Sequence, residues 1–543
     1  MAPLDWVVLG TYLSAMIGLA VWLSRGQETA EDYYVGGRNL PWWAVAVSTM
    51  ATQTSANSFI GIPAYVALKD GGGLTWLQYE LAVPLAMIVV MVFLIPFFRE
   101  MKLVSVYEYL ELRFDRPTRL VMSALFLISR GLATGVGVYA SAVVVNVCLG
   151  LPIWACIVLI GAVTVFYDTL GGMAAVVWSD VIQMVILLGG LIACIVYALG
   201  EDGGFAEALG TLDPERLRGL DTGHGIGDGS TAPMWGFLIG GLVLYISYYG
   251  VDQSQAQREL SAPTTADTKR SLVFNGLARF PLTILYVLMG IAVGAAYLRS
   301  PELQAAVPED HLDYLVPVFV LQRLPPGLTG LIFAAILSAA MSSLDSALNS
   351  LSAATMRDFV EPYALDRPES TESTEAQQAR LLRYGKITTV IWGIAMTGFA
   401  FFVGGISDTV VEGINKLGAF FYGPILAAFL TGILDRRARG PAMIAGVTAG
   451  IGINVVLWLA LDGVLYWMWW NLSGLVVATL VTFIASRFMA PPAAEKLEGT
   501  TLSLSDIPRR EKKWIPTYLF LVGYFVVILL VAGYSRELLS FLM

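Results

Sequence analysis

Serine and aspartate side chains crowd into one otherwise apolar helix in the second half of the chain. The stretch 328–337 is as apolar as a membrane-spanning segment, and residues 338–350 then read SAAMSSLDSALNS. A carboxylate in hydrocarbon costs about 2.5–3.5 kcal/mol, so such groups persist only where they face a bundle interior, pair or bind an ion. Their donor atoms are oxygens, which suit a hard cation rather than a transition metal. The pattern predicts an ion-coupled carrier.

A second apolar segment, 40–66, has a polar centre. Residues 48–58 read STMATQTSANS. Backbone leaves the helix at membrane depth only where it lines a buried or watery cavity, and such breaks mark binding sites in transporters. Unwound carbonyls near Ala51 and Thr54 would then be free to coordinate a cation. The alternative is a seam of small residues for helix packing.

An arginine inside a third apolar segment is a candidate for solute binding. Arg130 lies within the run 120–147 and is followed closely by three glycines, so a ligand can approach. A guanidinium binds a carboxylate through two parallel hydrogen bonds. Our hypothesis is that Arg130 holds an organic anion such as a monocarboxylate or an acidic sugar. The competing interpretation is an internal salt bridge to Glu80 or Glu412.

Membrane-spanning helices must position these residues. Hydrophobic residues make up 56% of the chain and charged residues 14%, against roughly 25% charged in an average soluble protein, and the mean hydropathy is +0.68. Apolar runs of about 20 residues can cross about 30 Å of hydrocarbon, and these do not alternate as strands would. We therefore predict an all-α polytopic membrane protein of about 14 transmembrane helices. The runs are 4–24, 40–66, 74–98, 120–147, 152–171, 173–199, 234–252, 271–297, 327–356, 387–404, 408–433, 441–461, 464–486 and 514–535.

Basic residues predict the orientation, because cytoplasmic loops are enriched in Lys and Arg. With the N-terminus outside, 24 of the 33 Lys and Arg fall in inside loops and 6 in outside loops. We expect an integral protein of the plasma (inner) membrane with both termini outside. The run 4–24 has no basic leader and is predicted to be a retained helix rather than a signal peptide.

Catalytic function is disfavoured by the loops. The largest inside loops, 357–386 and 487–513, are too short to fold independently, and no phosphate-cradling motif is present. We expect no enzyme activity, no nucleic-acid partner and no obligate protein partner.

Several longer motifs occur in the order known from one family of transporters. They are EDYYVGGR and LPWW at 31–38 and 40–43, SVYEYLELRF at 105–114, YDTLGGMAAVVWSD at 167–180 and DQSQAQR at 252–258. With the serine-rich helix they resemble the sodium:solute symporter family, which includes sodium–glucose, sodium–proline and sodium–iodide cotransporters. The last motif is similar to the family's loop after the sixth core helix.

The resemblance implies a leading helix, a ten-helix core of two inverted five-helix repeats with discontinuous helices, and trailing helices. Residues 1–39 would form the leading transmembrane helix and an inside loop. Residues 40–433 would form the core, and 434–543 would hold three trailing transmembrane helices. The runs 40–66 and 327–356 would be core helices 1 and 8, with Na+ bound between them.

Matching motifs imply a ligand set for this sodium ion. It consists of the carbonyl oxygens of Ala51, Thr54 and Ala339 and the hydroxyls of Ser342 and Ser343.

Some members of the family hold a second cation beside the aspartate that matches Asp180. On the serine-rich helix, Ser342, Asp345 and Ser346 have i, i+3, i+4 spacing and share one face. Asp345 departs from those members, which carry a small or hydroxyl residue there. Two carboxylates could hold a cation more tightly or share a proton. The alternative is a structural polar pairing without a role in transport.

Resemblance to sugar-transporting members adds further candidates for solute binding. Glu80 matches a sugar-contacting carboxylate and Tyr248 an inner gating aromatic. Arg279 falls where those members carry a lysine, and Asn415 near a glutamine. Ser58 and Tyr245 replace amide residues, so the sugar site is only partly preserved. The expected solute-binding set is Ser58, Glu80, Arg130, Tyr245, Tyr248, Arg279 and Asn415.

The function expected from the sequence is sodium-coupled symport. The protein would import a small polar organic solute by alternating access, with a preference for an organic anion such as a monocarboxylate or an acidic sugar. Its partners would be that solute, sodium ions and the lipid bilayer. The alternative solute is a neutral sugar or amino acid. Alternatives of another class are a solute sensor that does not transport and a channel, which could not concentrate solute.

Overall fold

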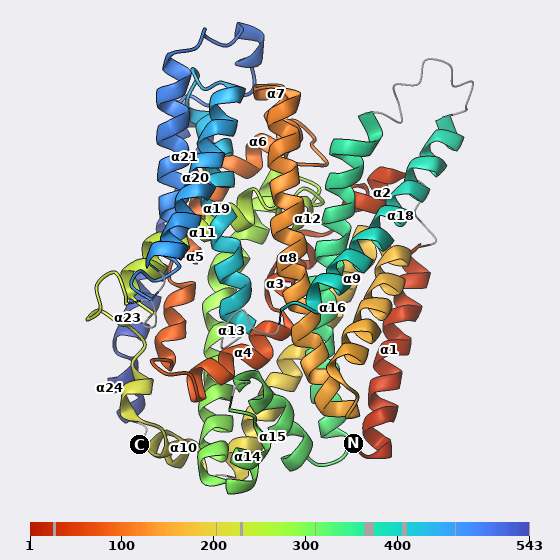
Figure 1. Cartoon of the computed structure of the whole chain (residues 1–543), viewed down its shortest axis with the longest axis vertical. Helices are drawn as coiled ribbons and strands as arrows, with labels where there is room; N and C mark the ends of the chain where they lie inside the picture. Colours follow the sequence, from red (N-terminus) through yellow and green to blue (C-terminus); the bar gives the residue numbers. More distant parts are fainter. Residues whose placement is uncertain are drawn as a thin grey trace.

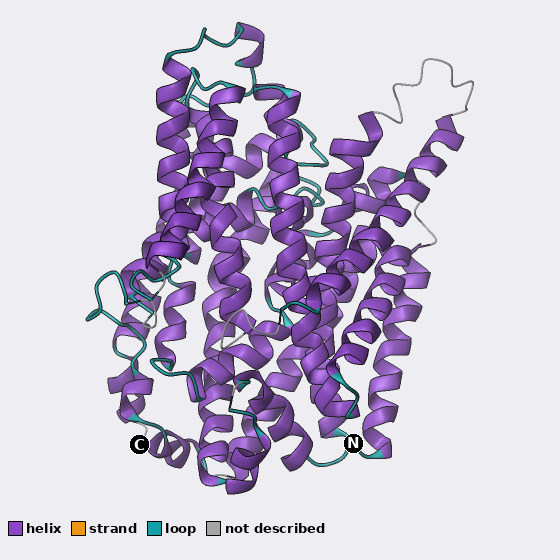
Figure 2. Cartoon of the chain, viewed as in Figure 1, coloured by secondary structure: helices purple, strands orange, loops and turns teal. Residues whose placement is uncertain are grey.

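The computed structural model describes residues 1–24, 29–201, 203–228, 232–309, 311–362, 374–403, 410–461, 463–505 and 507–541. These residues are almost entirely helical and include no strand (Figure 2). The helices up to residue 201 are α1 Pro3–Ser24, α2 Ala30–Val35, η1 Gly36–Arg38, α3 Trp42–Gln53, α4 Ala56–Ala67, η2 Leu74–Glu80, α5 Val83–Val89, η3 Val90–Leu94, α6 Ile95–Glu100, α7 Glu108–Arg113, α8 Arg116–Leu149 and α9 Ile153–Glu201.

The middle of the chain continues the bundle. Its helices are α10 Phe205–Thr211, η4 Pro214–Leu217, η5 Gly236–Gly240, α11 Gly241–Gly250, α12 Gln253–Glu259, α13 Thr265–Arg299, α14 Pro301–Ala306, η6 Leu312–Tyr314, α15 Leu315–Arg323, α16 Leu328–Ala354 and η7 Thr355–Val360. The last helices are α18 Thr374–Ala400, α19 Val410–Leu434, α20 Gly440–Leu461, α21 Trp469–Arg487, η8 Ala494–Lys496, α22 Ile507–Glu511, α23 Ile515–Gly533 and α24 Ser535–Ser540.

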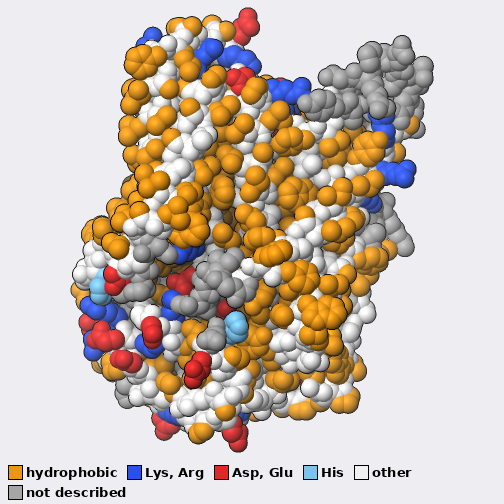
Figure 3. All heavy atoms as spheres, in the orientation of Figure 1, with side chains coloured by type: hydrophobic (Ala, Val, Ile, Leu, Met, Phe, Trp, Pro, Cys, Tyr) orange, Lys and Arg blue, Asp and Glu red, His pale blue; other side chains and the backbone are white. Residues whose placement is uncertain are grey.

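Ten helices among the described residues are long and apolar enough to cross a membrane, and two further apolar helices are shorter. On the face drawn in Figure 3, hydrophobic side chains cover most of the surface, and charged side chains gather near the top and in the lower part. All fourteen predicted runs overlap helices, yet the count of fourteen crossings stays a prediction. The adjoining ends of the runs 387–404 and 408–433 lie outside the described residues.

The expected break in the run 40–66 separates α3 from α4. Thr54 and Ser55 link the two halves, and the backbone of Ser55 is extended. The Thr54 amide still donates to the Ala51 carbonyl at 2.9 Å, which closes the last turn of α3. No side chain caps the amides at the start of α4. The break therefore leaves a polar helix N-terminus inside the bundle.

A second break separates α11 from α12 and corrects one expectation. The segment 252–258 was predicted to be a loop, but Gln253–Glu259 forms helix α12 with every residue buried. Its start is fixed by Asp252, whose side chain accepts a hydrogen bond from the Ser254 amide at 2.8 Å. Aspartate is a preferred N-cap residue, so Asp252 stabilises the start of α12. The polar composition of the segment did not indicate this helix.

Gly172 interrupts the long helix α9 with a non-helical backbone conformation. Its φ of 58° lies in the left-handed region that favours glycine. The two halves correspond to the predicted runs 152–171 and 173–199. Asp180 is thereby placed on the second half, facing α16, against which α9 packs.

The leading helix α1 packs against α9 and α16. Its Asp5 is buried, and one carboxylate oxygen accepts hydrogen bonds from the amides of Gly327 and Gly330 at 2.6 and 2.9 Å. Asp5 thus caps the start of α16, whose first amides have no partner within the helix. Both chain termini lie at the same end of the molecule (Figure 1).

Candidate functional site

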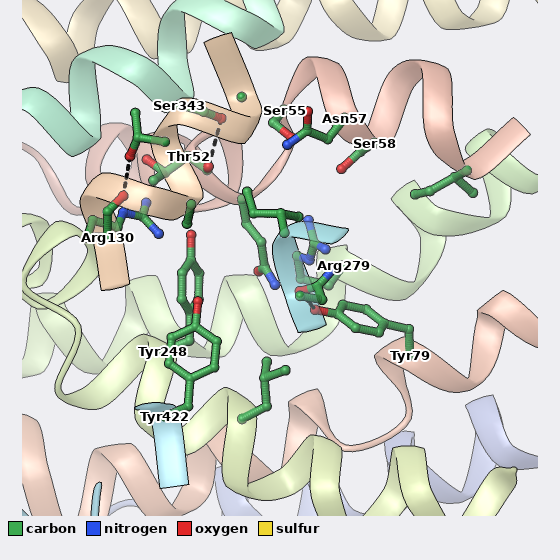
Figure 4. Close-up of a pocket in the computed structure, with 18 of the residues that line it drawn as sticks. Thr52, Ser55, Asn57, Ser58, Tyr79, Arg130, Tyr248, Arg279, Ser343 and Tyr422 are labelled. Atoms are coloured by element: carbon green, nitrogen blue, oxygen red, sulfur yellow. Dashed lines mark hydrogen bonds between the residues drawn. The ribbon is translucent and has the colours of Figure 1, made fainter. Parts of the chain in front are cut away.

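One polar cavity opens between the broken helix α3/α4 and helices α8, α11, α13, α16 and α19. Six of the seven predicted solute-binding residues line it, namely Ser58, Glu80, Arg130, Tyr248, Arg279 and Asn415. The seventh, Tyr245, is buried and contacts Glu80 through its hydroxyl at 3.3 Å. Figure 4 shows Arg130 near Thr52 on one side of the pocket and Arg279 near Tyr79 on the other.

Arg279 and Glu80 form a closely bonded pair. The guanidinium donates to the two carboxylate oxygens at 2.6 and 3.4 Å, and the third nitrogen donates to the Thr54 hydroxyl at 3.2 Å. Glu80 also accepts hydrogen bonds from Tyr245 and Thr283. Every nitrogen of Arg279 therefore has a protein partner, and the pair ties α13 to the break after α3.

Arg130 is held much more loosely. Its nearest carboxylate is Asp252, with 3.8 Å between the charged atoms, and its guanidinium lies over the ring of Tyr248. Its Nε is buried without a hydrogen-bond partner in the part of the chain that the structure describes. The salt-bridge partners named from the sequence are engaged elsewhere, because Glu80 pairs with Arg279 and Glu412 with Lys69.

The predicted sodium ligands come from the end of α3 and the middle of α16, and these elements meet. The Ser343 hydroxyl donates to the Thr52 carbonyl at 2.9 Å across the two helices, as Figure 4 shows. Ala51 and Ala339 are buried. The Thr54 hydroxyl donates to the Met50 carbonyl at 2.8 Å. Oxygen atoms from both helices thus gather beside the cavity.

Ser342 faces a different group from Ser343. Its hydroxyl donates to Asp180 at 2.5 Å, and the other oxygen of Asp180 accepts from Ser48 at 2.5 Å. The guanidinium of Arg258 lies 3.7 Å from Asp180 and contacts Ser346. The structure therefore brings Asp180, Ser342 and Ser346 together, with an arginine as their cationic neighbour.

Asp345 differs from these residues. Both of its carboxylate oxygens are buried without a hydrogen-bond partner among the described residues. Its charged neighbours include Asp168, Asp180 and Arg258. Asp168 is buried and unbonded in the same way. A carboxylate left without donors in a membrane interior needs a compensating cation or proton.

Three residues at the site were not anticipated from the sequence. Asp252 lies beside Arg130, and Arg258 lies beside Asp180. Asn57 lines the cavity at the start of α4, and both polar atoms of its buried side chain lack a hydrogen-bond partner among the described residues. Asp252 could have been found as an N-cap aspartate two residues before a serine. Asn57 stood within the polar stretch 48–58, but nothing in that stretch distinguished it.

Comparisons with known proteins identify the family of this chain. The model of the sodium:solute symporter family matches residues 33–450. This chain belongs to the sodium:solute symporter family. It is 29% identical to the sodium/sialic acid symporter NanT of Aliivibrio fischeri over 89% of this chain and 93% of that protein. It is 31% identical to the human sodium-coupled monocarboxylate transporter 1 over 85% of this chain and 74% of that protein.

A solved structure of a relative fixes the fold. The substrate-bound, outward-open sodium-coupled sialic acid symporter, described as revealing a novel sodium site, matches with a TM-score of 0.79 and 28% identity. The match covers 90% of this chain and 99% of that one. The predicted fold class, an all-α polytopic protein with an inverted-repeat core and discontinuous helices, is confirmed. The protein is a sodium-coupled symporter and not an enzyme, with sodium as the coupling ion.

Proposed function

We propose that the protein imports an organic anion bearing a carboxylate, such as an acidic sugar or a monocarboxylate, and that Arg130 holds the carboxylate. The observation that carries this proposal is the unused donor capacity of Arg130, whose buried Nε has no partner at the edge of the cavity. A guanidinium presents donors in a fork that fits a carboxylate. The relatives named for sialic acid and for monocarboxylates support an anionic solute.

The remaining solute contacts would come from the other cavity residues. Ser58 at the start of α4, Asn415 of α19 and Tyr248 of α11 line the cavity and offer hydrogen bonds to solute hydroxyl or amide groups. Glu80, Arg279 and Tyr245 would shape the site as a bonded cluster, since their polar groups are already engaged with each other.

Sodium would bind between α3 and α16. The ligands proposed are the carbonyls of Ala51, Thr54 and Ala339 and the hydroxyls of Ser342 and Ser343. The Ser343–Thr52 hydrogen bond supports this placement, because it brings a ligand hydroxyl to the last turn of α3. An ion bound there would hold the two helices together while the solute occupies the adjoining cavity. Ion and solute then favour the same conformation, which is the basis of coupling.

A second cation would bind at Asp180, Ser342, Asp345 and Ser346. The two unbonded oxygens of Asp345 support this proposal, since they are acceptors without donors. Arg258 already neutralises part of the charge of Asp180. The cation would therefore lie nearer to Asp345 than to the Arg258 guanidinium.

We assign residues 1–39 to a leading helix with its inside loop, 40–433 to the transport core and 434–543 to three trailing transmembrane helices. The protein would reside in the plasma (inner) membrane with both termini outside. The position of both termini at one end of the molecule supports a shared side (Figure 1), and the distribution of basic residues supports the outside.

Uptake into sealed proteoliposomes tests the function. Sialic acid, pyruvate, glucose and proline are supplied with an inward sodium gradient, or with potassium replacing sodium. We expect sodium-dependent accumulation of one of the two acids. Accumulation of glucose or proline alone would replace the anion with a neutral solute. Saturable binding without accumulation in either ion would favour the sensor.

A further inference from the structure

Asp252 and Arg130 are attracted to each other without being locked together. Both side chains are less than a tenth exposed, and the 3.8 Å between their charged atoms exceeds hydrogen-bond length. Arg130 belongs to α8 and lines the cavity, whereas Asp252 stands at the break between α11 and α12. A buried charge pair at this distance attracts strongly, and the Nε of the guanidinium has no hydrogen-bond partner among the described residues.

Asp252 has partners of its own that hold it in place. One carboxylate oxygen accepts hydrogen bonds from the amide and the hydroxyl of Ser254, at 2.8 and 2.6 Å. The other oxygen faces Arg130. The N-terminus of α12 stabilises the negative charge. Asp252 therefore keeps its position when Arg130 turns toward another carboxylate.

We infer that Asp252 is a specificity-determining positioning residue, whose carboxylate occupies Arg130 in the absence of solute and competes with the carboxylate of the incoming solute. The inference rests on the proposed binding of an organic anion by Arg130. A neutral solute cannot replace the charge of Asp252, so Arg130 stays with Asp252. An anionic solute can replace it, and Arg130 then loses its contact with Asp252 at the break between α11 and α12. Asp252 thus sets both the charge preference and the affinity.

The Tyr248 ring completes the arrangement. It lies 5.5 Å from the Arg130 guanidinium and lines the same cavity, three residues before the α11/α12 break. A cation is attracted to the face of an aromatic ring, so Arg130 stays between Tyr248 and Asp252. A solute carboxylate that draws the guanidinium into the cavity would therefore weaken two contacts of the broken helix α11/α12, the one with the Tyr248 ring and the one with Asp252.

The test compares an acid with its own amide. Asp252→Asn keeps the cap of α12, because asparagine is an equally good N-cap, and removes only the charge. With saturating sodium, KM is measured in proteoliposomes for whichever of sialic acid and pyruvate is accumulated, and for the amide of that acid. We expect Asp252→Asn to lower KM for the acid about fivefold and to leave KM for the amide unchanged.

Control variants separate charge from structure. Asp252→Ala removes the cap as well as the charge, and Ser254→Ala removes one partner of the cap while keeping the charge. Ser254→Ala is expected to leave the ratio of the two KM values unchanged. If Asp252→Asn leaves KM for the acid unchanged, or changes KM for acid and amide equally, the inference is overturned while the proposed function stands. If Arg130→Lys has no effect on acid uptake, the proposed function fails and the inference fails with it.

Discussion

Two arginines line the same cavity but differ in how fully they are bonded. Arg279 donates through all three nitrogens, two of them to Glu80. Arg130 stands 3.8 Å from Asp252 and keeps a buried Nε without a partner. These hydrogen bonds use one donor on each nitrogen of Arg279, three of its five N–H groups, and fix the guanidinium against Glu80 and Thr54. Burial of a charge in a transporter therefore does not separate a binding residue from a structural one, whereas the unpartnered Nε of Arg130 supports the proposal that Arg130 binds the solute.

The largest effect should come from breaking the closely bonded pair. Glu80→Ala leaves Arg279 buried without its counter-charge, which costs about 3–5 kcal/mol of stability. The thermal unfolding midpoint in detergent, followed by tryptophan fluorescence, should fall strongly. Asp252→Asn should lower it far less, because the Arg130 pair is longer. Equal midpoints for wild type and Glu80→Ala would refute the distinction between the two pairs.

The next effect concerns the loosely held arginine. Arg130→Lys keeps the charge but loses the planar fork, and hydrogen bonds to charged groups contribute about 1.5–3 kcal/mol each. We expect KM for an accumulated acid to rise about thirtyfold at constant unfolding midpoint, since 1.4 kcal/mol corresponds to a factor of ten. Sodium binding should survive. An equal loss of uptake for a neutral solute would assign Arg130 a structural role.

A smaller effect is expected beside the cavity, at the sodium ligands. Ser343→Ala removes one of five proposed ligand oxygens, so the sodium concentration for half-maximal uptake should rise about tenfold. Ser350→Ala is the matched control, because its hydroxyl donates to the Ala347 carbonyl of the same helix and, among the described residues, to no other group. Uptake is measured against sodium concentration at fixed solute. Identical curves for the two variants would remove Ser343 from the ligand set.

The smallest change in uptake is expected at the second cation position. Asp345→Ala should reduce the number of sodium ions moved per solute, because it removes two unbonded carboxylate oxygens. Dual-isotope flux of sodium and solute gives this ratio. A ratio of one sodium in wild type, with unaltered transport in Asp345→Ala, would contradict a second site. Asp180→Asn extends the test to the carboxylate that Arg258 already accompanies.

The positions of the helices could be predicted because membrane spans are read from continuous apolar runs. All fourteen runs overlap helices, and the polar centre of 40–66 marked the break between α3 and α4. Helix α12 was missed for a physical reason. Its residues are polar, and contacts with other segments bury them. One such contact is the hydrogen bond that the side-chain amide of Gln257 donates to the side-chain oxygen of Asn349. Composition does not reveal partners that are distant in the chain.

The same limit applies to the candidate site. The sequence identified Arg130 as a buried cation, but it could not rank Asp252 above Glu80 and Glu412 as its neighbour. Which carboxylate lies beside it depends on how α8 meets the broken helix α11/α12. Asn57 could not be singled out from the sequence either, because what sets it apart is a buried side chain without a hydrogen-bond partner among the described residues. Residue types were predictable, and their pairing was not.

The capping of α16 by Asp5 has a consequence for motion. Two hydrogen bonds fasten the start of α1 to the amides that open α16, so these two helices should travel as one body during the transport cycle. Spin labels placed on α1 and α16 should keep a fixed separation whether sodium is present or absent. Labels on α1 and α11 should report the swing between outward and inward states. Distances measured from the leading helix α1 can therefore report the movement of the other helices during the transport cycle.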